Sequence, residues 1–155
     1  MTELRFEPKN VDGWAMHALE FGNDKSVIMT VVHGKLSNAQ TKPGQKIRFP
    51  RQQEIAKIIK SKRGDKPRNK NSYYAISLGM RFSRHANQKQ PLDVDNFIKP
   101  IFAGTAAGLF SHEIPSSLKE FDLYDDSHFV YLYVEHLPDE PDKEGVAIVI
   151  SEEHM

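Results

Sequence analysis

The feature that most constrains the fold is a strict two-residue alternation between positions 73 and 82. Large apolar side chains recur at every second position, and small or polar residues and one arginine stand between them. Successive side chains of an extended chain point to opposite sides, so this period predicts a β-strand with an apolar face. The apolar positions are Tyr74, Ile76, Leu78, Met80 and Phe82.

Further elements can be placed around this strand. The β-branched stretch 26–34 predicts a buried strand, and 35–46 is polar and rich in turn residues. Residues 50–62 place three isoleucines on one helical face, with Pro50 acceptable in a first turn. A second helix is expected within 95–110, where Pro100 should lie near the first turn or kink the helix, and where Gly104 and Gly108 indicate close packing.

Two more strands are expected at 127–136 and 145–151, joined by a hairpin-like connection at 137–144. The order strand, helix, strand, helix, strand, strand predicts an α+β fold. A chain of 155 residues with 39% hydrophobic content suffices for one core. We therefore expect a single domain over 26–155, preceded by an N-terminal extension of uncertain structure at 1–25.

Composition excludes several classes of protein. The chain has no cysteine, which rules out disulfides, zinc–thiolate sites and cysteine nucleophiles. It also has no apolar run long enough to cross a bilayer, and its first residues carry charges where a signal peptide needs an apolar stretch. A soluble, cytoplasmic protein without membrane contact is the expectation.

The formal net charge of zero conceals a strong sorting of charges along the chain. Between Lys42 and Lys89 fourteen lysines and arginines face only two acids, whereas twelve acids face two lysines from Ile101 onward. The basic stretch fits either a solvated helix face with a polar loop or a surface that binds a polyanion. Charge alone does not decide between them.

The stretch "PLDVDNFIKP" (91–100) combines two acids with a lysine. On an extended segment Asp93 and Asp95 point to the same side, and Lys99 lies one helical turn after Asp95. Paired carboxylates suit magnesium or manganese, and a helix N-terminus with a lysine favours phosphate. Alternatively, Asp95 or Asn96 simply caps the helix, Asp93 pairs with a nearby cation, and Lys99 is a surface residue.

A second acidic pair, Asp125 and Asp126, stands directly before the apolar stretch 127–136. The order D-x-D-N-x-x-K-P, a helix, D-D-S and an apolar strand resembles the RusA-like family of Holliday-junction resolvases, from about Ser26 to the end of the chain. The resemblance implies a small mixed sheet flanked by two main helices. It also implies a homodimer that uses Mg²⁺, with Mn²⁺ as an alternative, to nick four-way or branched DNA.

By the same resemblance, the catalytic residues are Asp93, Asp95, Lys99 and Asp126, and the three acids among them hold the metal. Residues 111–124 are longer than the corresponding turn of the family, so Asp122 and Asp125 remain alternatives to Asp126. An active nuclease and a non-catalytic nucleic-acid-binding relative of the same fold are both open. If the strand ending near Phe82 and the one starting near Asp126 were parallel, a partner subunit would have to complete the site.

The basic region would follow the DNA backbone without reading its sequence. Tyr73 could stack on an unpaired base, whereas Tyr74 belongs to the apolar side of its strand. The expected DNA contacts are Arg48, Arg51, Lys57, Lys60, Lys62, Arg63, Lys66, Arg68, Lys70, Arg84 and Lys89.

Overall fold

A computed structural model describes residues 3–83 and 94–154, apart from the side chain of Asp126. The chain forms an α+β fold whose contacts divide it into two compact units. The sheet unit comprises residues 1–35, 70–89 and 129–155, and the helical unit comprises 36–69 and 90–128. Each unit is built from segments that are far apart in the sequence. Among the described residues, no helix has the length and apolarity needed to span a membrane.

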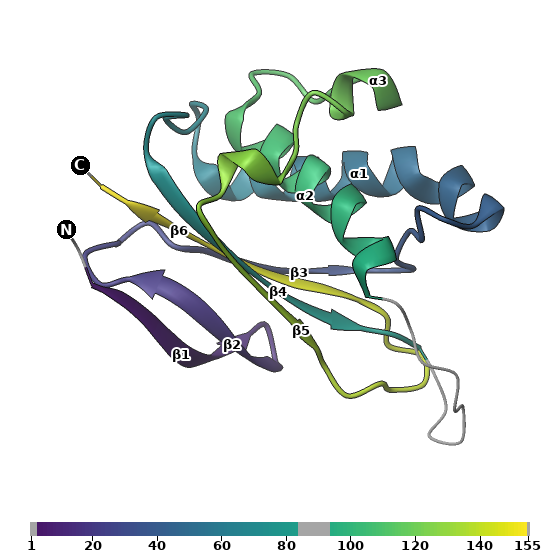
Figure 1. The fold of residues 1–155 in the computed structure, drawn as a ribbon, viewed down its shortest axis with the longest axis horizontal. Helices are drawn as coiled ribbons and strands as arrows, with labels where there is room; N and C mark the ends of the chain where they lie inside the picture. Colours follow the sequence, from purple (N-terminus) through teal and green to yellow (C-terminus); the bar gives the residue numbers. More distant parts are fainter. Residues whose placement is uncertain (1–2, 84–93, 155) are drawn as a thin grey trace. The chain divides into compact units, whose positions relative to one another are not determined.

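The sheet unit is organised by a mixed four-stranded sheet (Figure 1). Its strands are β3 (Ile28–His33), β4 (Tyr73–Arg81), β5 (Tyr131–His136) and β6 (Gly145–Glu153), in the order β3-β6-β4-β5. Strand β6 is antiparallel to both of its neighbours, whereas β4 and β5 are parallel. The strands expected at 26–34, 73–82 and 145–151 are confirmed, and Tyr74 is fully buried as its parity predicted.

The predicted hairpin between the last two strands is wrong, because β6 lies between β3 and β4 and does not pair with β5. The burial patterns give the physical reason. Every residue of β6 is buried, as expected for a central strand covered on both faces, whereas β5 has exposed residues at both ends, as expected for an edge. The strand expected from residue 127 begins only at Tyr131.

Residues 4–21, whose structure the sequence did not indicate, form a hairpin of β1 (Leu4–Val11) and β2 (Trp14–Phe21). Asp12 and Gly13 make the turn with φ values of 50° and 91°, the positive angles that a two-residue hairpin turn requires. Three alternate amides of β2 donate to side chains of the larger sheet, which protects this strand edge. The pairs are His17 N to Glu135 Oε1 (3.1 Å), Leu19 N to Ser77 Oγ (2.8 Å) and Phe21 N to Ser151 Oγ (2.9 Å).

A buried carboxylate fastens the turn after β2 to the end of β6. The side chain of Asp24 is 0% exposed, yet it accepts bonds from Ser151 Oγ at 2.9 Å and from the Glu152 amide at 2.8 Å. Ser26 and His154 bond its other oxygen. Burial raises the pKa of Asp24, but the hydrogen bonds from Glu152, Ser26 and Ser151 together outweigh burial and leave the pKa below its ordinary value.

The helical unit contains α1 (Lys42–Arg63), α2 (Asp95–Phe110), the short α3 (Leu118–Phe121) and a 3-10 turn, η1 (Asp126–His128). Helix α1 begins eight residues before the predicted start, so the expected turn-rich connection is partly helical. Thr41 caps it by accepting the Gly44 amide. Pro50 therefore lies inside the helix and not in its first turn. Pro50 and Lys46 are both exposed, so water can reach the Lys46 carbonyl that the proline leaves without a donor.

Helix α2 starts at Asp95 as expected, with Pro100 at its sixth position. The proline cannot donate to the Asn96 carbonyl, and the Ala39 amide takes its place at 2.8 Å. Gln52 of α1 donates to the Pro100 carbonyl at 3.2 Å. The predicted close packing at the two glycines is confirmed, because a Cβ on Gly104 or Gly108 would lie 3.0 or 2.6 Å from a backbone oxygen of α1.

Candidate active site

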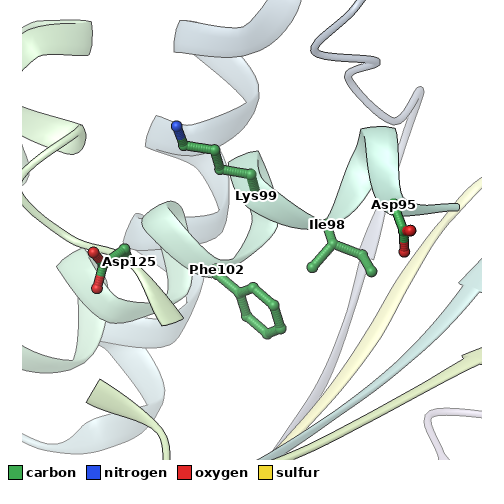
Figure 2. A pocket seen from close by; sticks show the side chains of 5 residues that line it. All are labelled: Asp95, Ile98, Lys99, Phe102 and Asp125. Carbon is green, nitrogen blue, oxygen red and sulfur yellow. The ribbon is translucent and has the colours of Figure 1, made fainter. Parts of the chain in front are cut away.

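A cavity of about 390 Å³ in the helical unit brings together three of the charged candidates: Asp95, Lys99 and Asp125. Ile98 and Phe102 complete its lining (Figure 2). In Figure 2, Asp95 and Asp125 lie toward opposite ends of the view, and Phe102 projects from α2 between them. The cavity therefore presents two carboxylates, one ammonium group and an apolar wall contributed largely by α2.

The spacing of α2 residues explains four of the five lining side chains. Positions 95, 98, 99 and 102 recur at three- and four-residue intervals, which places them along one face of a helix. Phe102 is only 6% exposed, whereas Asp95 and Lys99 are exposed. This face is thus apolar at its base and charged at its rim.

Asp95 is the first residue of α2 and not its cap. The N-cap position belongs to Val94, whose backbone is already helical and whose side chain makes no capping bond. The alternative in which Asp95 or Asn96 caps the helix is therefore wrong. As a first-turn acid, Asp95 still gains from the positive end of the helix dipole, but that benefit does not require a second acid or a lysine beside it.

Asp125 reaches the cavity from the turn before η1. Its Oδ1 accepts the Ser127 amide at 2.9 Å and the Ser127 hydroxyl at 2.5 Å. These bonds are the main reason that the pKa of Asp125 lies below its ordinary value, and the charges of His128 and Lys99 lower it further. Its Oδ2 accepts no hydrogen bond from the described residues. One carboxylate oxygen of Asp125 is therefore fixed by Ser127.

The segment 111–124, longer than in the family that the chain resembles, positions this turn. Phe121 of α3 is fully buried and packs with Ala56 and Ala107 from the two long helices. Asp122 accepts a bond from Arg48 Nη2 at 2.6 Å. The ring of His128 lies 5.0 Å from that of Phe110, at the last residue of α2. Asp122 is thus held in an ion pair, while Asp125 faces the cavity.

Several of the other predicted site residues lie outside the described part of the chain. Asp93 is outside the described residues, as are Arg84 and Lys89. Asp126 begins η1, and its side chain is outside the described part of the chain. Within the described part, no three residues among His, Cys, Asp and Glu form a group that could hold a metal. Among the described residues, the cavity contains two of the expected acidic side chains, Asp95 and Asp125.

Strands β4 and β5 are parallel, which is the arrangement expected to place acids at their ends on opposite edges of the sheet. Asp95 instead belongs to α2 and Asp125 to the turn before η1, and both line one cavity of the helical unit. A single chain therefore supplies both carboxylates of this cavity.

Several residues of the basic stretch make contacts within the helical unit. Arg51 pairs with Glu54 as Arg48 does with Asp122. Three others donate to backbone carbonyls: Lys60 to His112, Arg63 to Leu109 and Arg68 to Arg63. Lys57, Lys62, Lys66 and Lys70 are exposed.

No protein-family model matches the chain, and no curated protein matches it. The resemblance to the RusA-like resolvases therefore stays a prediction carried by the order of the motifs.

Proposed function

We propose that this protein is a metal-dependent endonuclease that hydrolyses phosphodiesters in four-way or branched DNA, as the RusA-like resolvases that it resembles do. The observation that carries the proposal is the cavity shared by Asp95, Lys99 and Asp125. Its members come from two segments separated by α3 and the residues around it. Acids for a cation and a lysine for a phosphate are the groups that such hydrolysis needs.

The carboxylates fit a magnesium or manganese ion by their chemistry. Both ions prefer hard oxygen ligands, and Asp125 presents an ionised carboxylate whose Oδ2 has no donor among the described residues. The ion would be held at one end of the cavity, by Asp95 or by Asp125, together with Asp93, Asp126 or both. When bound, the ion polarises the scissile phosphate and lowers the pKa of a coordinated water.

The remaining lining residues have roles that depend on their own chemistry. Lys99 offers a cation to the phosphate as negative charge develops on it. Ser127 holds Asp125 in its ionised form and fixes its orientation, as supporting residues of metal ligands commonly do. Ile98 and Phe102 give the cavity an apolar wall, against which a sugar or base edge can pack.

Cleavage of symmetrically related strands needs two active sites, so the proposal includes a homodimer in which each chain carries its own pair of acids. The region from Arg48 to Lys70 would contact the DNA backbone, and affinity should fall steeply as salt rises. Tyr73, which is 48% exposed, could stack on an unpaired base.

Two variants separate binding from catalysis. Asp95→Asn keeps the shape of the side chain but removes the charge of a metal ligand, so cleavage should fall at least ~100-fold while DNA binding holds or tightens. Lys99→Ala should also slow cleavage, but it removes an attraction to phosphate, so binding should be no tighter and its salt dependence slightly shallower.

The assays are gel shift and cleavage of a synthetic four-way junction, in magnesium and in EDTA. Cleavage by Asp95→Asn at the parental rate would refute the role of Asp95 as a metal ligand. If the parent bound the junction but did not cleave it in magnesium, the non-catalytic binding module would be the better description.

A further inference from the structure

A second cavity of the helical unit, of about 400 Å³, lies at the C-terminal end of α1. It is lined by three cations, Lys57, Lys60 and Arg63, with one acid, Asp65, and by Ser61 and Gly64. Lys57 and Lys60 are one helical turn apart, and Arg63 follows at the next turn. None of its lining residues lines the cavity of Asp95 and Asp125.

Arg63 is the least accessible cation of this cavity. The residue is 5% exposed, and its Nε is enclosed without a hydrogen-bond partner. Its Nη1 contacts the Leu109 carbonyl at a long 3.4 Å. Within the described residues, no carboxylate pairs with it. A buried guanidinium without a counter-charge is costly unless an anion joins it.

The net charge around this cavity is positive even when its acid and the negative ends of the nearby helices are included. Three cations against one carboxylate give a formal charge of +2 in the lining. The C-terminal ends of α1 and α2 lie beside Arg63, and each contributes about half a negative charge. Roughly one positive charge therefore remains, and Arg68, whose Nε donates to the Arg63 carbonyl at 3.1 Å, adds to it.

The mouth of the cavity can admit a ligand. Lys57 is exposed and makes no ion pair within the described part of the chain. Gly64 has a φ of 101°, and a Cβ built on it would meet nothing within 4 Å. Lys60 keeps two of its three ammonium protons after donating to the His112 carbonyl at 2.7 Å.

We propose that this cavity is a phosphate-binding site formed by Lys57, Lys60 and Arg63, and that it takes a backbone phosphate of DNA. The DNA assignment rests on the proposed nuclease function, whereas phosphate binding does not. Leu109, which Arg63 contacts, lies fourteen residues after Asp95 on α2, a distance of about 21 Å along the helix. The site would therefore hold a phosphate about 21 Å from the Asp95 end of the first cavity, and so orient the DNA arm.

The first test uses inorganic phosphate as the probe and thermal unfolding of the full chain as the readout. Phosphate replaces chloride at constant ionic strength, and the parent is compared with Lys57→Gln, Arg63→Met and Lys46→Gln. Lys46 is an exposed lysine of the same helix that does not line the cavity, which makes it the matched control. Phosphate also stabilises folded proteins in general, so the difference between variants is the measure.

The phosphate-dependent rise of the unfolding midpoint should be lost in Lys57→Gln and Arg63→Met and kept in Lys46→Gln. Arg63→Met should lose it even if its stability in chloride is unchanged, which a purely structural arginine would not explain. Lys57→Gln, at an exposed position, keeps the test valid if Arg63→Met does not fold. Equal phosphate effects in all four proteins would overturn the proposal.

The second test separates the sources of the phosphate. Duplex DNA binding is measured over a salt series, and Lys57→Gln should make the slope of log K against log salt shallower by about 0.9. A phosphate effect in the first test without any change in this slope would refute the DNA assignment. If both tests succeed but the parent cleaves no branched DNA, the phosphate site stands and the nuclease proposal fails.

Discussion

Gly108 is the position where the packing of α1 against α2 can be tested most sharply. A Cβ added there would lie 2.6 Å from the Ala56 carbonyl oxygen and 2.9 Å from the Ile59 Cβ. Favourable carbon contacts need about 3.5–4.0 Å, so the two helices would have to move apart by roughly 1 Å. The nearest atom belongs to a helix backbone, which cannot rotate away as a side chain can.

The size of the effect follows from two opposed terms. Gly108→Ala gains about 1 kcal/mol of helix propensity. An extra methyl group in a packed core costs about 1–3 kcal/mol, and a clash with backbone belongs at the upper end of that range. We therefore expect a net loss of about 1–2 kcal/mol. Gly104→Ala is the matched variant, because its Cβ would lie 3.0 Å from the Gln52 oxygen and should cost less.

Urea unfolding of the parent and both variants measures these losses directly. A parent-like or higher stability for Gly108→Ala would show that α1 and α2 do not pack as described. The same shift should disturb catalysis, because α2 carries both Asp95 and Lys99. Gly108→Ala should therefore lower cleavage more than Gly104→Ala does.

Two further predictions concern single carboxylates. The lowered pKa of Asp24 means that its ionised form contributes stability above the ordinary value of 3.8, and that this contribution is lost as pH falls through the lower folded pKa. Asp24→Asn should thus cost about 1.5–3 kcal/mol at pH 7 in urea unfolding. An unchanged difference at a pH well below 3.8 would contradict this assignment. Asp125→Asn should abolish junction cleavage while Asp122→Asn, which only releases Arg48, should retain it. The reverse result would make Asp122 the metal ligand.

Much of the fold could be read from local patterns. The alternation at 73–82 predicted strand β4, and the glycine spacing at 104 and 108 predicted a close helix contact. The structure confirms both. The hairpin of β1 and β2 was missed although Asp12-Gly13 is a strong turn signal between residues of alternating burial. The early start of α1 was missed because Pro43 and Gly44 read as turn residues, whereas both lie in the first turn after the Thr41 cap.

Strand pairing could not be predicted in the same way. The partner of β5 depends on contacts between segments far apart in the sequence, and the short connection to β6 favoured the wrong neighbour. The uniformly apolar run of β6 was the available signal that it occupies a central place.

The sequence indicated the charged residues of the candidate site, but not which of the later acids lines the cavity or which residue holds it. Helical spacing alone placed Asp95 and Lys99 on one face. The choice among the later acids needed the structure, because only the ion pair of Arg48 with Asp122 and the cavity position of Asp125 distinguish them. Ser127 was overlooked, although a serine two residues after an aspartate is a familiar side-chain turn.

The most direct test of the nuclease proposal is the cleavage of a synthetic four-way DNA junction by the unmodified protein, with magnesium and with EDTA. The account predicts nicks in the junction with magnesium and none in EDTA, together with weaker cleavage of a linear duplex of the same sequence. An intact junction in magnesium and in manganese, or equal cleavage in EDTA, would contradict it.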